Sequence, residues 1–289
     1  MWCLSHIPIF LLIALLFFAC EPEDSDPGEF RYPLQVGNRW EYTRETGQYI
    51  YEDMDSAGTP VYIDTTTYPY LVTALVTEAT TWGDTLRVSA IYSEEVSDSF
   101  GTLTGTQYYT NHDDGLYCYA YMGGSDIFPL PKRTTSRGIR FKDMSFSDVH
   151  AMSTCLQNII PYAQMKGDSL YFNDPPRKVI QYPLEVGTHW LFSTRYIKID
   201  KEVMGKESIQ VPAGNFDCWK IQWLYDMNHD EQWDENITII DYICHKGLIK
   251  RILHLEGAVM TTLWDPDGSM ETKWVDIHDE AVLTYVSVD

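Results

Sequence analysis

The chain has 289 residues, of which 44% are hydrophobic and 14% aromatic, so it has ample material for a packed core. Its 42 acidic and 21 basic residues give a formal net charge of -21. This charge makes nucleic acid and anionic lipid headgroups unfavourable partners, because both are bound through clustered Lys and Arg. A net charge far from zero favours solubility, and this is the simplest interpretation of the acidity in an exported protein.

The amino terminus carries an apolar run over residues 7–19 (IPIFLLIALLFFA), followed at once by Cys20. The run is too short for a comfortable transmembrane helix, which needs about 20 residues, and it suits the core of a signal peptide. The junction Phe17-Phe18-Ala19-Cys20 resembles the bacterial lipobox, in which a small residue precedes a cysteine that is acylated after cleavage. This resemblance implies a signal peptide over residues 1–19 and palmitate on Cys20. The alternative is an ordinary signal peptide with an incidental cysteine.

The segment after Cys20 is acidic, and we interpret residues 20–31 as a flexible tether. Several acyl chains on Cys20 would make the membrane a stable partner. The prediction is a component of the bacterial cell envelope, anchored in the outer membrane and facing the periplasm or the cell surface.

A repeat organises the rest of the chain. Residues 32–40 (YPLQVGNRW) recur as residues 182–190 (YPLEVGTHW), with six of nine positions identical. Each copy is followed by an alternating aromatic segment, which is typical of the start of a strand. The repeat predicts two tandem units, residues 32–175 and 176–289, with a boundary near Pro175-Pro176.

Strand patterns are plentiful in both units, and polar turns rather than helices separate them. We expect strands near residues 68–78, 85–94 and 106–121, and near 190–199, 202–211, 216–225, 237–245, 247–256 and 281–288. Residues 145–165 are the one plausible helix, and Pro161 would end it. The fold class predicted is mainly β, with two antiparallel β-meander units in a curved sheet, half-barrel or sandwich and little helix.

One hairpin can be predicted in register. Residues 216–225 and 237–245 flank a polar segment, and pairing them about Glu231 separates an apolar face from a polar one. The apolar face places Trp219, Ile221, Trp223 and Tyr225 opposite Ile243, Asp241, Ile239 and Ile237, so Asp241 is its one polar member.

The same register sets Cys218 opposite Cys244, at a distance close to disulfide geometry. After cleavage before Cys20 the chain would keep four further cysteines, an even number that is compatible with two disulfides in an exported protein. We predict Cys218–Cys244 from the register and Cys118–Cys155 by elimination.

The turn of this hairpin is acidic and has oxygen side chains at alternate positions. Asp226, Asn228, Asp230 and Asp234 match the first, third, fifth and ninth positions of an EF-hand loop, which predicts a possible calcium site. Glu231 replaces the usual glycine and Ile237 replaces the bidentate glutamate. The alternative is a solvated acidic loop without metal, and no other cofactor is indicated.

Three motifs carry a resemblance to a group of uncharacterised bacterial envelope lipoproteins: the repeated YPLxVGxxW opening, residues 211–218 (VPAGNFDC) and residues 246–250 (KGLIK). Such proteins resemble the curved sheets of outer-membrane lipoprotein carriers, whose concave face accepts acyl chains. The resemblance implies structural roles for the motif residues and transfers no activity.

Three functions follow as expectations. The first is a non-catalytic binding or scaffold lipoprotein that binds an envelope protein or an apolar ligand. The second is a carrier that holds a lipid or other apolar ligand on a concave sheet. The third is a metal-dependent envelope hydrolase that uses the acidic loop. The chain contains no G-x-S-x-G, P-loop, dinucleotide or HExxH motif, so we expect no enzyme.

Overall fold

A computed structural model describes residues 30–123, 138–142, 144–158, 169–194, 197–263 and 270–289. Six strands come from the first part of the chain: β1 (Arg39–Met54), β2 (Pro60–Trp82), β3 (Leu86–Ser97), β4 (Gly101–His112), β5 (Gly115–Gly123) and β8 (Leu170–Gln181). Six come from the second part: β9 (His189–Ser193), β10 (Lys198–Val211), β11 (Gly214–Asp226), β12 (Ile237–Cys244), β13 (Gly247–Leu263) and β14 (Met270–Ser287). The short strands β6 (Gly138–Phe141) and β7 (Met144–Phe146) and the helix α1 (Val149–Asn158) lie between β5 and β8.

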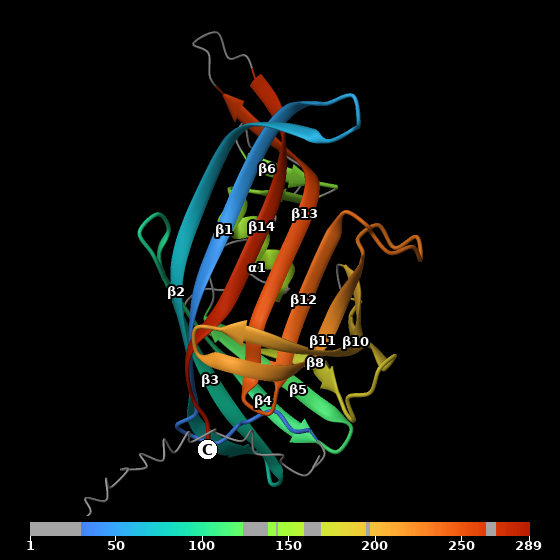
Figure 1. Ribbon diagram of the computed structural model, residues 1–289. Coiled ribbons are helices and arrows are strands. Elements are labelled where there is room, and N and C mark those ends of the chain that lie inside the picture. The colour runs from blue at the N-terminus through green and yellow to red at the C-terminus, as the bar shows by residue number, and fades with distance from the viewer. Residues whose placement is uncertain (1–29, 124–137, 143, 159–168, 195–196, 264–269) are drawn as a thin grey trace, which may run out of the picture.

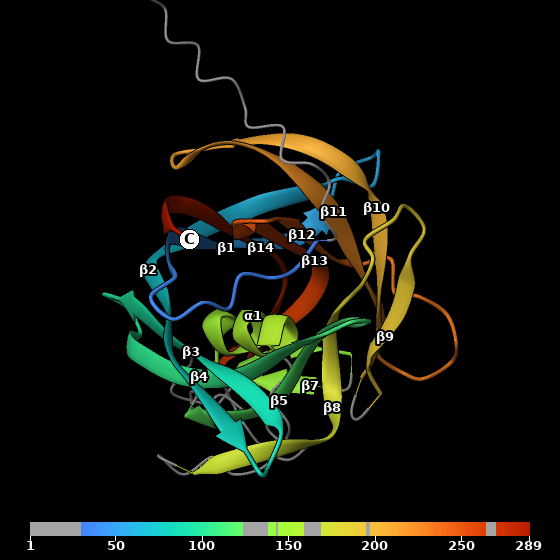
Figure 2. The same ribbon diagram turned by 90° about the horizontal axis from the view of Figure 1, so that it is seen from below.

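These strands form one antiparallel sheet in the order β8-β5-β4-β3-β2-β1-β14-β13-β12-β11-β10-β9. The sheet curves into a nearly closed barrel around α1 (Figures 1 and 2). The prediction of a mainly β, antiparallel curved sheet with little helix is therefore confirmed. In the part of the chain that the structure covers, no helix has the length and apolar character needed to cross a membrane.

The two copies of the opening motif make the same local structure. Gly37 N donates a hydrogen bond to Val76 O at 2.9 Å, and Gly187 N donates one to Val203 O at 2.8 Å. Each valine donates back to the residue after the glycine at 2.9 Å, and the sheet register shifts directly after each valine. Both glycines have positive φ angles, +97° and +83°, which L side chains rarely adopt.

The strand order extends this equivalence to the whole barrel. Each half contributes six main strands, β1 to β5 with β8 and β9 to β14, and the two sets follow each other around the sheet in the same sense. β1 pairs with β14, while β8 and β9 are the two ends of the sheet order and lie next to each other. The two units thus share one sheet and enclose one interior.

The prolines at residues 175 and 176 lie within β8, at one end of the sheet. The ladder with β5 passes from Phe172 opposite Ala120 to Arg177 opposite Cys118, so both prolines fall in an unpaired bulge. Proline has no N–H to donate and is tolerated at such edge and bulge positions. The chain passes between the halves at residues 182–188, directly before β9.

One predicted strand is two strands in the structure. Residues 106–121 contain the end of β4, a turn at Asp113-Asp114 and β5. Gly115 begins β5, and a Cβ atom there would lie 2.4 Å from Ile180 O of β8, so glycine permits this close approach. The sequence 114–116 (DGL) has a counterpart in residues 246–248 (KGL), which begins β13 in the second half.

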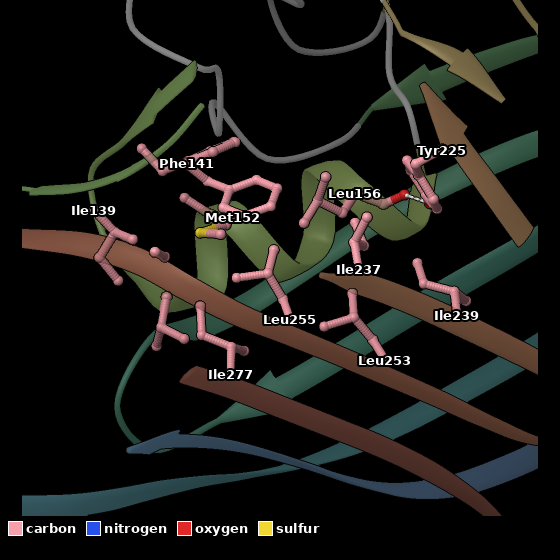
Figure 3. Packing of buried hydrophobic residues seen from close by; sticks show 14 of the residues in the cluster. Ile139, Phe141, Met152, Leu156, Tyr225, Ile237, Ile239, Leu253, Leu255 and Ile277 are labelled. Carbon is pink, nitrogen blue, oxygen red and sulfur yellow. Dashed lines mark hydrogen bonds between the residues drawn. The ribbon is translucent and has the colours of Figure 1, made fainter. Parts of the chain in front are cut away.

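The predicted helix is present as α1 and fills part of the barrel. Asp148 Oδ1 accepts the N–H of Ala151 at 2.8 Å and caps the first turn. Met152 and Leu156 are fully buried against the concave face of the sheet, among a cluster that includes Tyr225 and Leu255 (Figure 3). Tyr225 donates its hydroxyl to Leu156 O at 2.8 Å, which ties the helix to β11. The end predicted at Pro161 lies outside the described residues.

The segment before β1 crosses one end of the barrel, and we call residues 30–38 the closing segment (Figure 2). Tyr32 N donates to Tyr182 Oη at 3.0 Å, so the two copies of the opening motif meet here. Asn111 Nδ2 donates to Tyr32 O at 2.8 Å, and Arg31 donates to His112 O at 2.5 Å. The closing segment is therefore fixed to β4 and to the start of the second half.

Candidate functional site

The barrel encloses a cavity of about 200 Å³ between its two halves. Equivalent positions of the two halves line it. Ile91 and Ile221 are one such pair of positions, because Ile91 lies opposite Val76 in the first half and Ile221 lies opposite Val203 in the second. Leu116 and Leu248 are another, because each follows the glycine that begins its strand, β5 or β13. Other apolar lining residues are Val179, Ile180 and Ile243, with Tyr32 and Tyr109. The cavity is thus an apolar space built from both repeats.

Three charged side chains also line this cavity: Lys201 of β10, Asp241 of β12 and Arg251 of β13. Asp241 and Arg251 face each other across neighbouring strands, and the guanidinium contacts both carboxylate oxygens, at 2.6 and 3.0 Å. Trp223 Nε1 donates to Asp241 Oδ2 at 2.9 Å. We call Lys201, Asp241 and Arg251 the charged wall.

Lys201 is 2% exposed and lies among aromatic rings. Its Nζ is 3.7 Å from the ring centre of Trp223 and 4.2 Å from that of Phe192, which stabilises the cation. It donates to Val179 O at 3.4 Å and is 3.9 Å from Asp241 Oδ2. Burial lowers the pKa of Lys201 to about 7 despite the attraction of Asp241, and the nearby Arg251 lowers it further.

Asp241 stays ionised in the same environment. Burial alone would raise the pKa of this carboxyl group, but Arg251 and then Lys201 hold it below its ordinary range. Burial acts against the charge of Arg251 too, yet Asp241 raises its pKa. The charged wall therefore combines a firmly paired carboxylate and guanidinium with an ammonium group that titrates near neutral pH.

A second buried ionic cluster lies beneath α1 and joins the helix to the sheet. Asp279 of β14 accepts hydrogen bonds from Arg44 Nε at 3.0 Å and Nη2 at 2.8 Å, from Ser153 Oγ at 2.8 Å and from Gln157 Nε2 at 2.9 Å. Thr46 donates to the same carboxylate. Every partner of Asp279 is a side chain of the protein, so this cluster has a structural role.

The acidic loop uses its carboxylates for its own backbone. Asp226 is fully buried and accepts the N–H groups of Asp230 at 3.0 Å and Glu231 at 3.1 Å, while Asp234 accepts that of Met227 at 2.8 Å. Asn228 Nδ2 donates to Asp230 at 2.8 Å. Within the described ranges, no three His, Cys, Asp or Glu side chains are grouped as a metal site. Calcium at Asp226, Asn228, Asp230 and Asp234 stays a prediction.

The predicted register of the hairpin is present in the structure. Trp219 pairs with Ile243, Ile221 with Asp241, and Trp223 with Ile239. Continuing the ladder by one residue sets Cys218 opposite Cys244. The two thiols are buried and free.

In an oxidising compartment we expect Cys218 and Cys244 to form a disulfide. Peptide mass spectrometry of the exported protein, unfolded in the presence of an alkylating reagent and without reductant, should recover the two cysteines in one linked fragment. Reduction should then lower the free energy of unfolding by about 3 kcal/mol, because the bond closes a loop of this length in the unfolded chain. Recovery of Cys218 and Cys244 as separate alkylated peptides would contradict the prediction.

The cysteines of the second predicted pair belong to different elements of the fold. Cys118 of β5 is buried beside Asn173, whereas Cys155 of α1 packs against the core cluster beneath the helix, and both are free thiols. The pair Cys118–Cys155 therefore stays a prediction. Cys20 lies outside the described residues.

The comparisons with known proteins give one family and two structures. A DUF3108-like family model matches residues 193–251, which contain β10, β11, β12 and all three members of the charged wall. A crystal structure of a protein provisionally named a lipoprotein, from Parabacteroides distasonis, is 14% identical with a TM-score of 0.35, covering 91% of this chain and 100% of that one. An exported protein, also provisionally named, with a YmcC-like fold from Bacteroides fragilis is 13% identical with a TM-score of 0.36, covering 90% and 100%. No curated protein matches the chain.

Sequence reasoning named Asp241 as the one polar residue on an apolar face but assigned it no role. The same signal exists in β10 and β13. Lys201 lies two residues from the buried Ile199 and two from the buried Val203, so its side chain is on the inward face of β10. Arg251 lies two residues before the buried Leu253 and is on the inward face of β13 for the same reason. A charged residue at an inward position of each of β10, β12 and β13 is therefore the pattern that could have revealed the charged wall.

Proposed function

We propose that this chain is a lipid-anchored envelope protein with a non-catalytic binding role, and that its ligand occupies the cavity between the two halves. The observation that carries the proposal is the cavity itself, which combines an apolar lining from both repeats with a charged wall. Binding sites for small molecules have this composition, because apolar surface supplies affinity and a few polar groups fix orientation.

The anchor is supported by the sequence that precedes the barrel. The apolar run over residues 7–19 ends in Ala19-Cys20, and acidic sequence separates this junction from the closing segment. Acylation of Cys20 would hold the barrel at the outer membrane, on its periplasmic or its outer face.

The interior favours a small ligand over a long acyl chain. α1 packs against the concave face, where its side chains fill the core (Figure 3). The remaining cavity of about 200 Å³ is smaller than the roughly 300–1,000 Å³ of sites for drug-sized ligands. A small-molecule binding protein therefore fits the geometry better than a carrier of whole lipids on an open sheet.

The acidic loop does not favour the hydrolase alternative. Its carboxylates Asp226 and Asp234 accept backbone N–H groups, so they hold the loop in shape instead of facing a shared ligand position.

Two measurements test the two parts of the proposal. In a bacterial host with an outer membrane, radiolabelled palmitate should mark the wild type and leave Cys20→Ala unlabelled. Native mass spectrometry of gently purified protein should show a bound small molecule that is released on unfolding. A wild type without label would remove the anchor, and a mass equal to that of the empty mature chain would remove the binding role.

A further inference from the structure

We propose that the cavity binds a small organic monoanion, a carboxylate on an apolar body of about six to eight carbon atoms, with the carboxylate held by Lys201. This inference rests on the proposed binding role and names the class of ligand. Three properties of the cavity carry it: hydrogen-bond donors that the protein leaves unused, an excess of positive charge, and the size of the apolar lining.

The first property is the donor capacity of Lys201. An ammonium group has three N–H donors. Among the described residues, the one hydrogen bond that the ammonium group of Lys201 makes is to Val179 O, at 3.4 Å, which is long for such a bond. Asp241 Oδ2, at 3.9 Å, lies beyond hydrogen-bond distance. A ligand oxygen in the cavity could therefore accept hydrogen bonds from N–H groups of Lys201 that have no acceptor among the described residues.

The second property is the charge balance of the wall. Lys201 and Arg251 carry two positive charges against the single negative charge of Asp241, and Asp241 is already bound by Arg251 and by Trp223. A cation that is buried without its own counterion is costly. One ligand carboxylate beside Lys201 would neutralise the wall, whereas a dianion would leave a buried excess of negative charge.

The third property is the shape of the remaining space. An engineered apolar cavity of about 150 Å³ holds a benzene molecule, so about 200 Å³ has room for a ring or a short alkyl chain with a carboxylate. Ile91, Ile221, Leu116 and Leu248 line this space from both halves. Sugars and phosphate esters, which need many hydrogen bonds, would leave polar groups unpaired against these side chains.

The experiment uses the purified full chain in detergent and compares benzoate with benzyl alcohol, which has a similar shape but no charge. Calorimetric titration should show benzoate binding at least about tenfold more tightly, as expected for hydrogen bonds to a charged group. Lys201→Met should remove this preference. Lys206→Met, an exposed lysine on the same strand, should leave it within about twofold.

The wild type offers a second readout that needs no variant. Because the pKa of Lys201 is about 7, benzoate should bind more weakly at pH 8.5 than at pH 6 and should take up a proton when it binds near pH 7.5. The charged groups that face Lys201 are Asp241 from β12, Arg251 from β13 and Arg177 from β8. The affinity for benzyl alcohol should not follow this pH dependence.

The outcomes separate this inference from the proposed function. Equal binding of both probes, or a preference that survives Lys201→Met, would overturn the carboxylate while leaving the binding role intact. Failure of both probes together with a different molecule in the native mass spectrum would overturn the ligand class alone. Failure of both probes and an empty native protein would overturn both proposals.

Discussion

Replacing Asp279 with alanine should lower the free energy of unfolding by about 3–5 kcal/mol, because it leaves the buried Arg44 guanidinium without its main counterion. Arg44 would keep Glu95, at 2.6 Å, but Nε would lose its acceptor. Ser153 and Gln157 would lose the carboxylate that ties α1 to β14. Urea unfolding of wild type and variant at neutral pH measures the difference.

The control for this variant is Glu45→Ala, an exposed carboxylate on the outer side of β1. It should change stability by less than about 0.5 kcal/mol, as is usual for surface substitutions. A loss for Asp279→Ala that is no larger than the loss for Glu45→Ala would show that the ionic cluster does not stabilise the barrel.

The same comparison should depend on pH. Burial alone would raise the pKa of Asp279, but Arg44 and the hydrogen bonds of Thr46 and Ser153 bring it below its ordinary range. A carboxyl group whose pKa is lower in the folded state stabilises that state above the unfolded pKa of about 3.9 and loses this contribution as the pH falls through the folded value. The difference between wild type and Asp279→Ala should therefore shrink as the solution is acidified below about pH 4.

Replacing Gly247 with alanine should lower the free energy of unfolding by about 2–5 kcal/mol. Gly247 has a φ angle of +100°, and a Cβ atom there would lie 2.8 Å from Nε1 of the buried Trp40. The indole donates to Lys246 O at 2.5 Å, so it cannot move away without losing this bond. The left-handed backbone costs roughly 1–2 kcal/mol and the crowding costs roughly 1–3 kcal/mol.

Gly37→Ala is the matched control for the crowding. Gly37 has a nearly identical φ angle of +97°, but its Cβ atom would meet nothing within 4 Å. Thermal or urea unfolding should show only the backbone cost of about 1–2 kcal/mol for this variant. Equal losses for the two variants would mean that the barrel accommodates the contact with Trp40 and that the crowding argument is wrong.

The sequence was most informative where the physical signal is local. The register of the β11–β12 hairpin could be predicted because one pairing alone segregates apolar from polar faces, and the structure has the pairs Trp219–Ile243 and Trp223–Ile239. The two copies of the opening motif were predictive for the same reason, since a glycine turn and a following tryptophan define the start of a strand.

The features that the sequence did not reveal depend on distant contacts. Arg44 and Asp279 are separated by 235 residues, and their contact depends on the pairing of β1 with β14. The turn at Asp113-Asp114 is an exception, because the Asp-Gly pair at residues 114–115 is a local turn signal that the predicted strand over residues 106–121 does not take into account. The charged wall also depends on contacts between strands: β11 separates β10 from β12, and the curved sheet places Lys201 3.9 Å from Asp241, which Arg251 also binds.

The position of the closing segment also determines which end of the barrel would face a bilayer. Nine residues separate Cys20 from Phe30, and the ten steps from one Cα atom to the next reach at most about 36 Å in a fully extended chain. With Cys20 acylated, the barrel end that Tyr32 covers would lie toward the lipid surface. The tip of the β1–β2 hairpin, at the far end in Figure 1, would then project into the aqueous space and present the exposed side chains of Met54, Val61 and Ile63.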